Sequence, residues 1–515
     1  MQGTAHVLGY LEGNAVRFPR HAATPGTGVT PAPDDLLRKF FSAVESGIEI
    51  GTLINRDRVP VMLNPNGLRR HLAVIAQTGA GKSYTVGVIL EKLLQLGGTI
   101  VVFDPNSDYV LMRRDAKNNR TSFADRVEIY RLPTTQAGRI TDEEIGSPKP
   151  KTFTMQFSKL DADELIAMSG VPDKASRIRL AINTVWENLQ GRDYTAENFK
   201  AELETLADSV YSQDAEGGSR KRSLHPSIGD EKEFDREFKK RIVEKADVEW
   251  DDLGHNEPGE DTPKPKEEKS KSSKSLAFEA SLGAQGALKY IHRLEGLGIW
   301  GFEDVPMEPL LRPMGLSVID LAGIDQDIMQ YVVDKVLRET WSVAVNQGLP
   351  RPIFFVLEEA HNFVPGDKSV SSQAARIIKR IASEGRKFGL FLVLITQRPY
   401  KVHQDTLSQC NSQIIMRLTN PQDQDAVTKA SESMSEGLLA DLPGLNIGEA
   451  VVLGPLVRVP VMVRVGARES KEGGNDIDVI AALERARSEV LTDVREQKSK
   501  EEKKARGRSE WKEAV

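Results

Sequence analysis

Cysteine and long apolar runs are both scarce in this sequence. Cys410 is the one cysteine among 515 residues, so no disulfide can form within the chain, as is typical of proteins in a reducing cytosol. The longest apolar stretches, such as residues 390–395, are far too short to span a bilayer. The first residues contain no basic segment followed by an apolar run, so no signal peptide is expected. These absences predict a cytoplasmic protein without membrane contact.

Two further absences narrow the chemistry. The sequence contains no cluster of histidine and cysteine, so a zinc site is not expected. The formal net charge is −6, so the chain as a whole is not basic. Any contact with DNA must therefore come from local basic patches, such as loops that line a channel. The length suggests two or three structural units.

The order of apolar segments predicts an α/β fold with an insertion. Residues 1–66 contain short β-like pieces broken by Gly and Pro, which predict part of a small β-barrel or sandwich. A strand, a Gly-rich loop, a helix and a second strand follow within residues 71–103, and this βαβ unit predicts a parallel sheet. From residue 316 the pattern returns as short runs that are apolar on both faces, which suits a parallel sheet covered by helices.

The predicted α/β core is thus divided into two parts, residues 67–135 and 306–466. The intervening residues 136–305 read mostly as amphipathic helices and predict a helical insertion. Within it, residues 256–275 are rich in charge and of low complexity, so we expect a flexible, solvated insert. Residues 467–515 predict a helical segment that ends in a highly charged tail.

A phosphate-binding loop lies between the first predicted strand and helix of the core. It reads Ala76-Gln-Thr-Gly-Ala-Gly-Lys-Ser83, with Ala in place of the usual first Gly. The two glycines let the backbone curl so that its N–H groups point at phosphate oxygens, and the helix start adds its positive dipole end. Lys82 should reach the β and γ phosphates of ATP, and Ser83 should place its hydroxyl on Mg²⁺. The loop residues predicted to contact ATP are Thr78, Gly79, Ala80, Gly81, Lys82, Ser83 and Tyr84.

Two adjacent carboxylates follow an apolar run at residues 353–357. The first carboxylate after a strand can hold Mg²⁺ through water, and the next can orient the attacking water. We assign Glu358 to the metal and Glu359 to the role of catalytic base, and the reverse assignment stays open. The alternative is an exposed Glu pair that caps a helix start.

Four other residues lie close to predicted strands, and each has two interpretations. Gln397 either senses the γ-phosphate or caps a strand. Asp104 either positions water or Mg²⁺, or caps the following turn. Arg386 either reaches the γ-phosphate of a neighbouring subunit as an arginine finger or satisfies carbonyls at a helix end. For His361 we expect a structural hydrogen bond rather than metal ligation.

Taken together, these motifs resemble the HerA helicases of the HerA and FtsK group. The phosphate loop alone would fit many families, whereas the paired Glu before Ala-His, the Gly-Arg-Lys-Phe-Gly turn and the Thr-Gln-Arg-Pro segment are much more specific. The resemblance covers roughly residues 5–120 and 275–466. The similar stretches are residues 70–83, 102–105, 357–363, 384–389, 396–399, 407–413, 417–421 and 442–450.

The resemblance implies a RecA-like P-loop NTPase core with a partial N-terminal β-barrel and a helical insertion. It also implies a homo-hexameric ring with double-stranded DNA in its central channel. Arg386 then sits where the family's trans-acting arginine is expected, and Arg70 matches another basic position that can touch nucleotide at the interface. The family's remaining functional positions fall on Lys82, Ser83, Glu358, Glu359 and Gln397.

The resemblance also implies partners. Family members commonly work with a nuclease of the NurA type in DNA end resection and repair, and some bacterial relatives pair with defence effectors. An ATP-driven ring scaffold that regulates an effector nuclease in anti-phage defence is therefore an alternative. A protein-remodelling ATPase is a third hypothesis, which only the acidic net charge favours. Candidate DNA contacts in the channel are Lys368, Arg398 and Lys401, for which solvated surface charge is the competing explanation.

Overall fold

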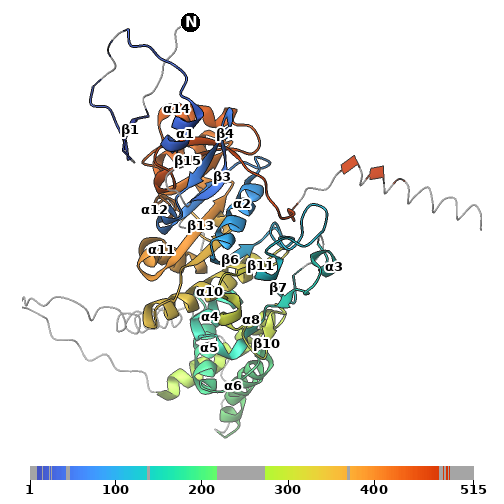
Figure 1. Ribbon diagram of the computed structural model, residues 1–515. Helices are drawn as coiled ribbons and strands as arrows, with labels where there is room; N and C mark the ends of the chain where they lie inside the picture. Colours follow the sequence, from blue (N-terminus) through green and yellow to red (C-terminus); the bar gives the residue numbers. More distant parts are fainter. Residues whose placement is uncertain are drawn as a thin grey trace, which may run out of the picture.

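A 12-stranded sheet forms the centre of the molecule (Figure 1). The computed structural model describes residues 8–474, except 14, 22–23, 25, 42–46, 136–139, 217–272 and 368–371, and a few residues between 479 and 487. In spatial order the strands are β4 (Arg56–Leu63), β3 (Ile48–Leu53), β16 (Val461–Val465), β15 (Glu449–Leu453), β14 (Ser412–Met416), β5 (Leu72–Ile75), β13 (Leu390–Thr396), β12 (Ile353–Leu357), β6 (Thr99–Asp104), β11 (Leu316–Asp320), β7 (Val127–Arg131) and β8 (Lys151–Thr152). From β14 to β8 all neighbours are parallel, whereas β15, β16, β3 and β4 pair antiparallel.

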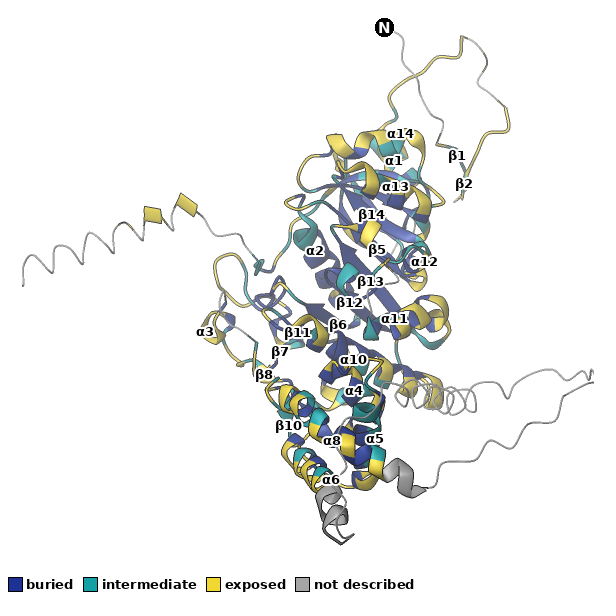
Figure 2. Ribbon diagram, turned by 180° about the vertical axis from the view of Figure 1, so that it is seen from behind, coloured by how far each residue is buried: buried dark blue, intermediate teal, exposed yellow. Residues whose placement is uncertain are grey.

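Helices cover both faces of this sheet, because its central strands are apolar throughout. In β5, Ala73 and Ile75 face one hydrophobic core, and Leu72 and Val74 face the other. The first core also contains residues of α10 (Gln326–Asn346) and α11 (Gln373–Glu384), and the second contains residues of α2 (Lys82–Gln95). Figure 2 shows the buried sheet between helices whose outer faces are exposed. The predicted α/β core with a parallel sheet is confirmed.

The first strands of the chain differ from the expected barrel. In the described part of residues 1–66, β1 (Tyr10–Glu12) and β2 (Ala15–Arg17) form a separate antiparallel pair, followed by α1 (Asp34–Phe41). The hairpin of β3 and β4 does not close a barrel there. It extends the central sheet through β16, with Ile50, Val59 and Val61 fully buried. The apolar side chains of β3 and β4 are therefore buried against the core of the central sheet and not inside a barrel.

The predicted helical insertion is present. Its bundle consists of α4 (Ala162–Ser169), α5 (Ser176–Leu189), α6 (Ala196–Glu216) and α8 (Ser273–Glu295), which gather at one end of the molecule in Figure 1. The insertion also supplies β8 at the edge of the sheet and the small parallel pair β9 (Met155–Gln156) and β10 (Trp300–Gly301). The charged insert lies outside the described residues up to residue 272, and α8 begins within its predicted range.

Shorter helices connect the remaining strands, and the predicted tail starts differently from expectation. These helices are α3 (Asp142–Ile145), α9 (Met307–Leu310), α12 (Gln404–Gln409), α13 (Pro421–Ala430) and α14 (Glu436–Asp441). Residues 467–474 are not helical; their backbone packs on α2, where the N–H groups of Glu469 and Ser470 donate to Glu91. Among the described residues, every helix is too short or too polar to cross a membrane.

His71 joins three elements at the amino end of β5. Its Nε2 lies 3.0 Å from the carbonyl oxygen of Ala382 in α11, and its Nδ1 accepts the N–H of Leu392 in β13 at 2.9 Å. This pattern requires a neutral ring with the proton on Nε2. Burial lowers the pKa of His71 from 6.5 to about 4.

We expect His71 to make the protein less stable as the pH falls from about 6.5 to about 4. In this range the unfolded chain binds a proton at His71 that the folded chain does not, so the free energy of unfolding rises with pH. From about pH 7.5 to about pH 5 the loss should be about 2 kcal/mol. Urea unfolding at both pH values should show a smaller loss for His71→Gln than for the wild type. An equal loss in both proteins would contradict the prediction, and His292→Gln at an exposed position is the control.

Candidate nucleotide-binding and hydrolysis site

The phosphate loop lies at the carboxyl edge of the parallel sheet, between β5 and α2. Gly79 and Gly81 have φ of +75° and +94°, a region that side chains other than glycine rarely enter. This geometry turns the loop around Ala80, which is fully buried, and leads directly into α2 at Lys82. Ala76 is also fully buried, and its N–H donates to the carbonyl of Thr396 at 3.3 Å. A small residue therefore fits the start of the loop.

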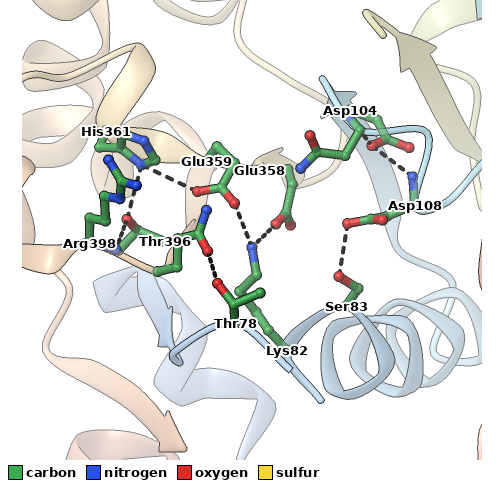
Figure 3. A network of polar contacts seen from close by, with 12 residues as sticks. Thr78, Lys82, Ser83, Asp104, Asp108, Glu358, Glu359, His361, Thr396 and Arg398 are labelled. Carbon is green, nitrogen blue, oxygen red and sulfur yellow. Dashed lines mark hydrogen bonds and ion pairs between the residues drawn. The ribbon is translucent and has the colours of Figure 1, made fainter. Parts of the chain in front are cut away.

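The paired carboxylates face the lysine of this loop (Figure 3). The Lys82 ammonium group donates to Glu358, and it lies 3.1 Å from Oε1 of Glu359. Parallel pairing of β12 with β13, and of β13 with β5, brings together two segments that lie far apart in the sequence. Glu358 is fully buried and Glu359 is only 7% exposed, which does not fit an exposed Glu pair at a helix start.

The two carboxylates differ in their protonation chemistry. Burial raises the pKa of Glu358, although the charge of Lys82 opposes this effect. Burial alone would also raise the pKa of Glu359, but the neighbouring His361 and the charge of Lys82 hold it below its usual range. For Lys82, both carboxylates raise the pKa despite burial. The lysine is thus charged and Glu359 is ionised.

Ser83 has a carboxylate partner that the sequence did not reveal. Its hydroxyl donates to Oδ2 of Asp108 at 2.8 Å, and the hydroxyl of Tyr109 donates to Oε2 of Glu358 at 2.9 Å. Asp104 shapes the turn that carries both residues, because it accepts the N–H of Asp108 at 3.0 Å and that of Tyr109 at 2.8 Å. Asp104 thus caps this turn, as one of its two predicted roles requires, and Asp108 makes the direct contact with Ser83. No pattern in the sequence marked either partner.

The oxygen atoms around Ser83 fit Mg²⁺ by their chemistry. Within the described residues no group of three His, Cys, Asp or Glu could hold a metal alone. Mg²⁺ in nucleotide sites usually takes one or two protein oxygens, phosphate oxygens and water. The hydroxyl of Ser83 and the carboxylates of Asp108 and Glu358 are hard oxygen donors of this kind, beside the loop where phosphates would bind.

Polar residues after β13 complete the side of the site next to Glu359. The hydroxyl of Thr78 in the phosphate loop donates to Oε1 of Gln397 at 2.5 Å, so the predicted sensor touches the loop directly. Nδ1 of His361 lies 3.2 Å from Oε2 of Glu359 and 3.3 Å from Oγ1 of Thr396. The sequence predicted only a structural hydrogen bond for His361 and gave no role to Thr396.

Arg70 and Arg386 lie at the amino ends of the parallel strands, whereas the phosphate loop lies at the carboxyl ends. Arg70 precedes β5 and Arg386 precedes β13, and the two strands are parallel. Both side chains line a pocket of about 570 Å³ with Asn64, Asn66, Gly67, Arg69 and Pro455. A strand rises about 3.3 Å per residue, so the length of β5 separates these arginines from the phosphate loop of the same chain by more than about 10 Å. Neither arginine can serve that loop.

Of the candidate DNA contacts, two are described. Arg398 and Lys401 are exposed on the turn that follows β13. Lys368 lies outside the described residues.

A phosphate loop whose lysine meets paired carboxylates at the carboxyl edge of a parallel sheet defines a P-loop ATPase. Residues 48–340 match the family described as the central domain of helicase HerA. The chain is 31% identical to the DNA double-strand break repair helicase HerA of Pyrococcus furiosus, over 93% of this chain and 81% of that protein. It is 28% identical to the protein of that name from Saccharolobus solfataricus, over 88% of this chain and 75% of the relative.

The chain belongs to the HerA helicase family, and it is an ATP-hydrolysing helicase or translocase. The resemblance inferred from the sequence motifs is thereby confirmed. Among solved structures, plasmid coupling protein TrwB bound to a non-hydrolysable ATP analogue is 16% identical, with a TM-score of 0.48 over 90% of this chain and 98% of that one.

Proposed function

We propose that this chain is the subunit of a homo-hexameric ring that uses ATP and Mg²⁺ to move double-stranded DNA through its central channel. We propose further that the ring works in the cytoplasm with a nuclease partner of the NurA type in DNA end resection and repair. The names of the relatives, which are double-strand break repair helicases, support the repair role.

The position of the two arginines is the observation that carries the ring assignment. Lys82, Glu358 and Glu359 form a hydrolytic site at one edge of the sheet, whereas Arg70 and Arg386 line a pocket at the other edge. An arginine that completes a nucleotide site must then come from a neighbouring subunit. Head-to-tail contacts that repeat in this way close into a ring when the rotation between neighbouring subunits closes, and we propose that it does so here.

In the site, Lys82 would bind the β and γ phosphates, and Ser83 with Glu358 would hold Mg²⁺, which would supply charge neutralisation at the phosphates. Glu359 takes a proton from water as the water oxygen bonds to the γ-phosphorus and the bond to ADP breaks. Gln397, which accepts a hydrogen bond from Thr78, would sense the γ-phosphate through the loop.

Double-stranded DNA should stimulate ATP hydrolysis several-fold, and the stimulation should weaken as salt rises because backbone contacts release counterions. Turnover should be measured with and without DNA at two salt concentrations, and the particle mass with and without ATP. The mass should correspond to six subunits. A hexamer whose turnover ignores DNA would favour the ring scaffold that regulates an effector, and a monomer under all conditions would exclude the ring.

A further inference from the structure

Two loops beside the catalytic carboxylate are joined by their backbones. The first, residues 360–367, follows β12 and contains His361. The second, residues 397–403, follows β13. The N–H of Gly366 donates to the carbonyl of Lys401 at 2.7 Å, and that of His403 to the carbonyl of Val364 at 2.9 Å. A β-bridge between Pro365 and Val402 lies between these bonds. A displacement of the second loop therefore moves the first.

The exposed part of the second loop has the chemistry of a nucleic-acid contact. We call residues 398–401 the rim turn. Arg398, Tyr400 and Lys401 are exposed on it, and the Lys401 ammonium lies 5.8 Å from the ring centre of Tyr400. Cations beside an exposed aromatic ring suit a phosphate backbone and its bases.

One nitrogen connects the rim turn with the catalytic carboxylate, as Figure 3 shows. Nδ1 of His361 is 3.2 Å from Oε2 of Glu359 and 3.3 Å from Oγ1 of Thr396, and Oγ1 also accepts the N–H of Arg398 at 3.0 Å. The contact with Glu359 is an ion pair when His361 is protonated, whereas the contact with the hydroxyl of Thr396 is a hydrogen bond. Only the first arrangement restrains Glu359, so the contact has two discrete states.

Glu359 is held from several sides in the present arrangement. Its Oε1 lies next to Lys82 and its Oε2 next to His361, and its φ of +52° is uncommon for a residue with a side chain. Bound ATP would attract the Lys82 ammonium group to its phosphates. Of the two contacts of Glu359, only the one with His361 would then remain.

We propose that His361 is a positioning residue that restrains Glu359 until a nucleic-acid backbone binds the rim turn and transfers His361 to the hydroxyl of Thr396. The identity of the polyanion as DNA rests on the proposed function. The restraint itself rests on the contacts of His361 with Glu359 and Thr396.

Two variants should lower the DNA stimulation in different ways. His361→Ala removes the restraint, so turnover without DNA should rise several-fold and the ratio of DNA-stimulated to DNA-free turnover should fall toward one. Thr396→Val removes the alternative partner, so DNA-free turnover should not rise and the stimulated rate should fall. ATP binding, measured with a fluorescent analogue, should be unchanged in both. His292→Ala and Thr428→Val, at exposed helical positions, are the matched controls.

A purely structural role for His361 would lower both rates of His361→Ala and keep their ratio, and this outcome would overturn the proposal. A wild type that ignores DNA would refute the proposed function instead, and the DNA-free rate of His361→Ala would still decide whether the restraint exists. Should His361→Ala fail to fold, a normal stimulation ratio in Thr396→Val would reject the coupling.

Discussion

Replacing Glu359 by Gln should leave ATP bound and almost uncleaved, with kcat lowered by about 100- to 10,000-fold. The amide keeps the shape of the side chain but cannot take a proton from water. Glu359 is the carboxylate whose pKa is held low, and it is ionised beside Lys82. Glu358 is fully buried with a raised pKa, and it accepts hydrogen bonds from Lys82 and Tyr109. These contacts suit a residue that holds the neighbouring side chains of the site in position.

The measurement is single-turnover hydrolysis together with the Kd for ATP. In Glu359→Gln the Kd should stay within a few-fold of the wild type while hydrolysis stops. Glu358→Gln should weaken binding that depends on Mg²⁺ and lower hydrolysis as a consequence. Normal ATP binding with no cleavage in Glu358→Gln, but not in Glu359→Gln, would show that the two roles are reversed. Glu187→Gln, at an exposed position of α5, is the control.

The sequence predicted the meeting of Lys82 with Glu358 and Glu359 because each motif follows a recognisable apolar strand. Strands that run parallel in one sheet bring their carboxyl ends to the same edge, so the site follows once the strands are identified. Asp108 and Tyr109 could not be predicted in this way. They reach the site through a turn shaped by hydrogen bonds to Asp104, and no residue pattern encodes the course of that turn.

The sequence predicts part of a barrel or sandwich for the N-terminal strands because a period of two shows that a strand is half buried but not which strand covers it. β3 pairs with β16, which lies some 400 residues further along the chain. Short-range patterns carry no information about such a partner. The hydrogen-bond partner of His361 could not be predicted for a related reason, since the contact with Thr396 depends on how β12 and β13 align.

Mixing two inactive variants, Arg386→Ala and Lys82→Ala, should restore part of the ATP hydrolysis. On the proposed assignment each change alone should nearly abolish turnover, since Lys82 would hold the phosphates and Arg386 would act as an arginine finger, which contributes about 1,000- to 100,000-fold to kcat. In a mixed ring, the intact loop of an Arg386→Ala subunit can face the intact arginine of a Lys82→Ala neighbour. With equal amounts and random assembly, about a quarter of the interfaces are complete.

The control for this complementation is a mixture of Lys82→Ala with Glu359→Gln. Both changes affect the same half of the interface, since Lys82 and Glu359 lie 3.1 Å apart in one chain, so no interface regains both groups and turnover should stay absent. Arg70→Ala mixed with Arg386→Ala should fail for the same reason, because both arginines line one pocket. Absence of recovery for Arg386→Ala with Lys82→Ala at every ratio, in particles shown by mass to contain both variants, would mean that Arg386 does not act across the interface. The pocket at the amino edge of the sheet would then need another explanation.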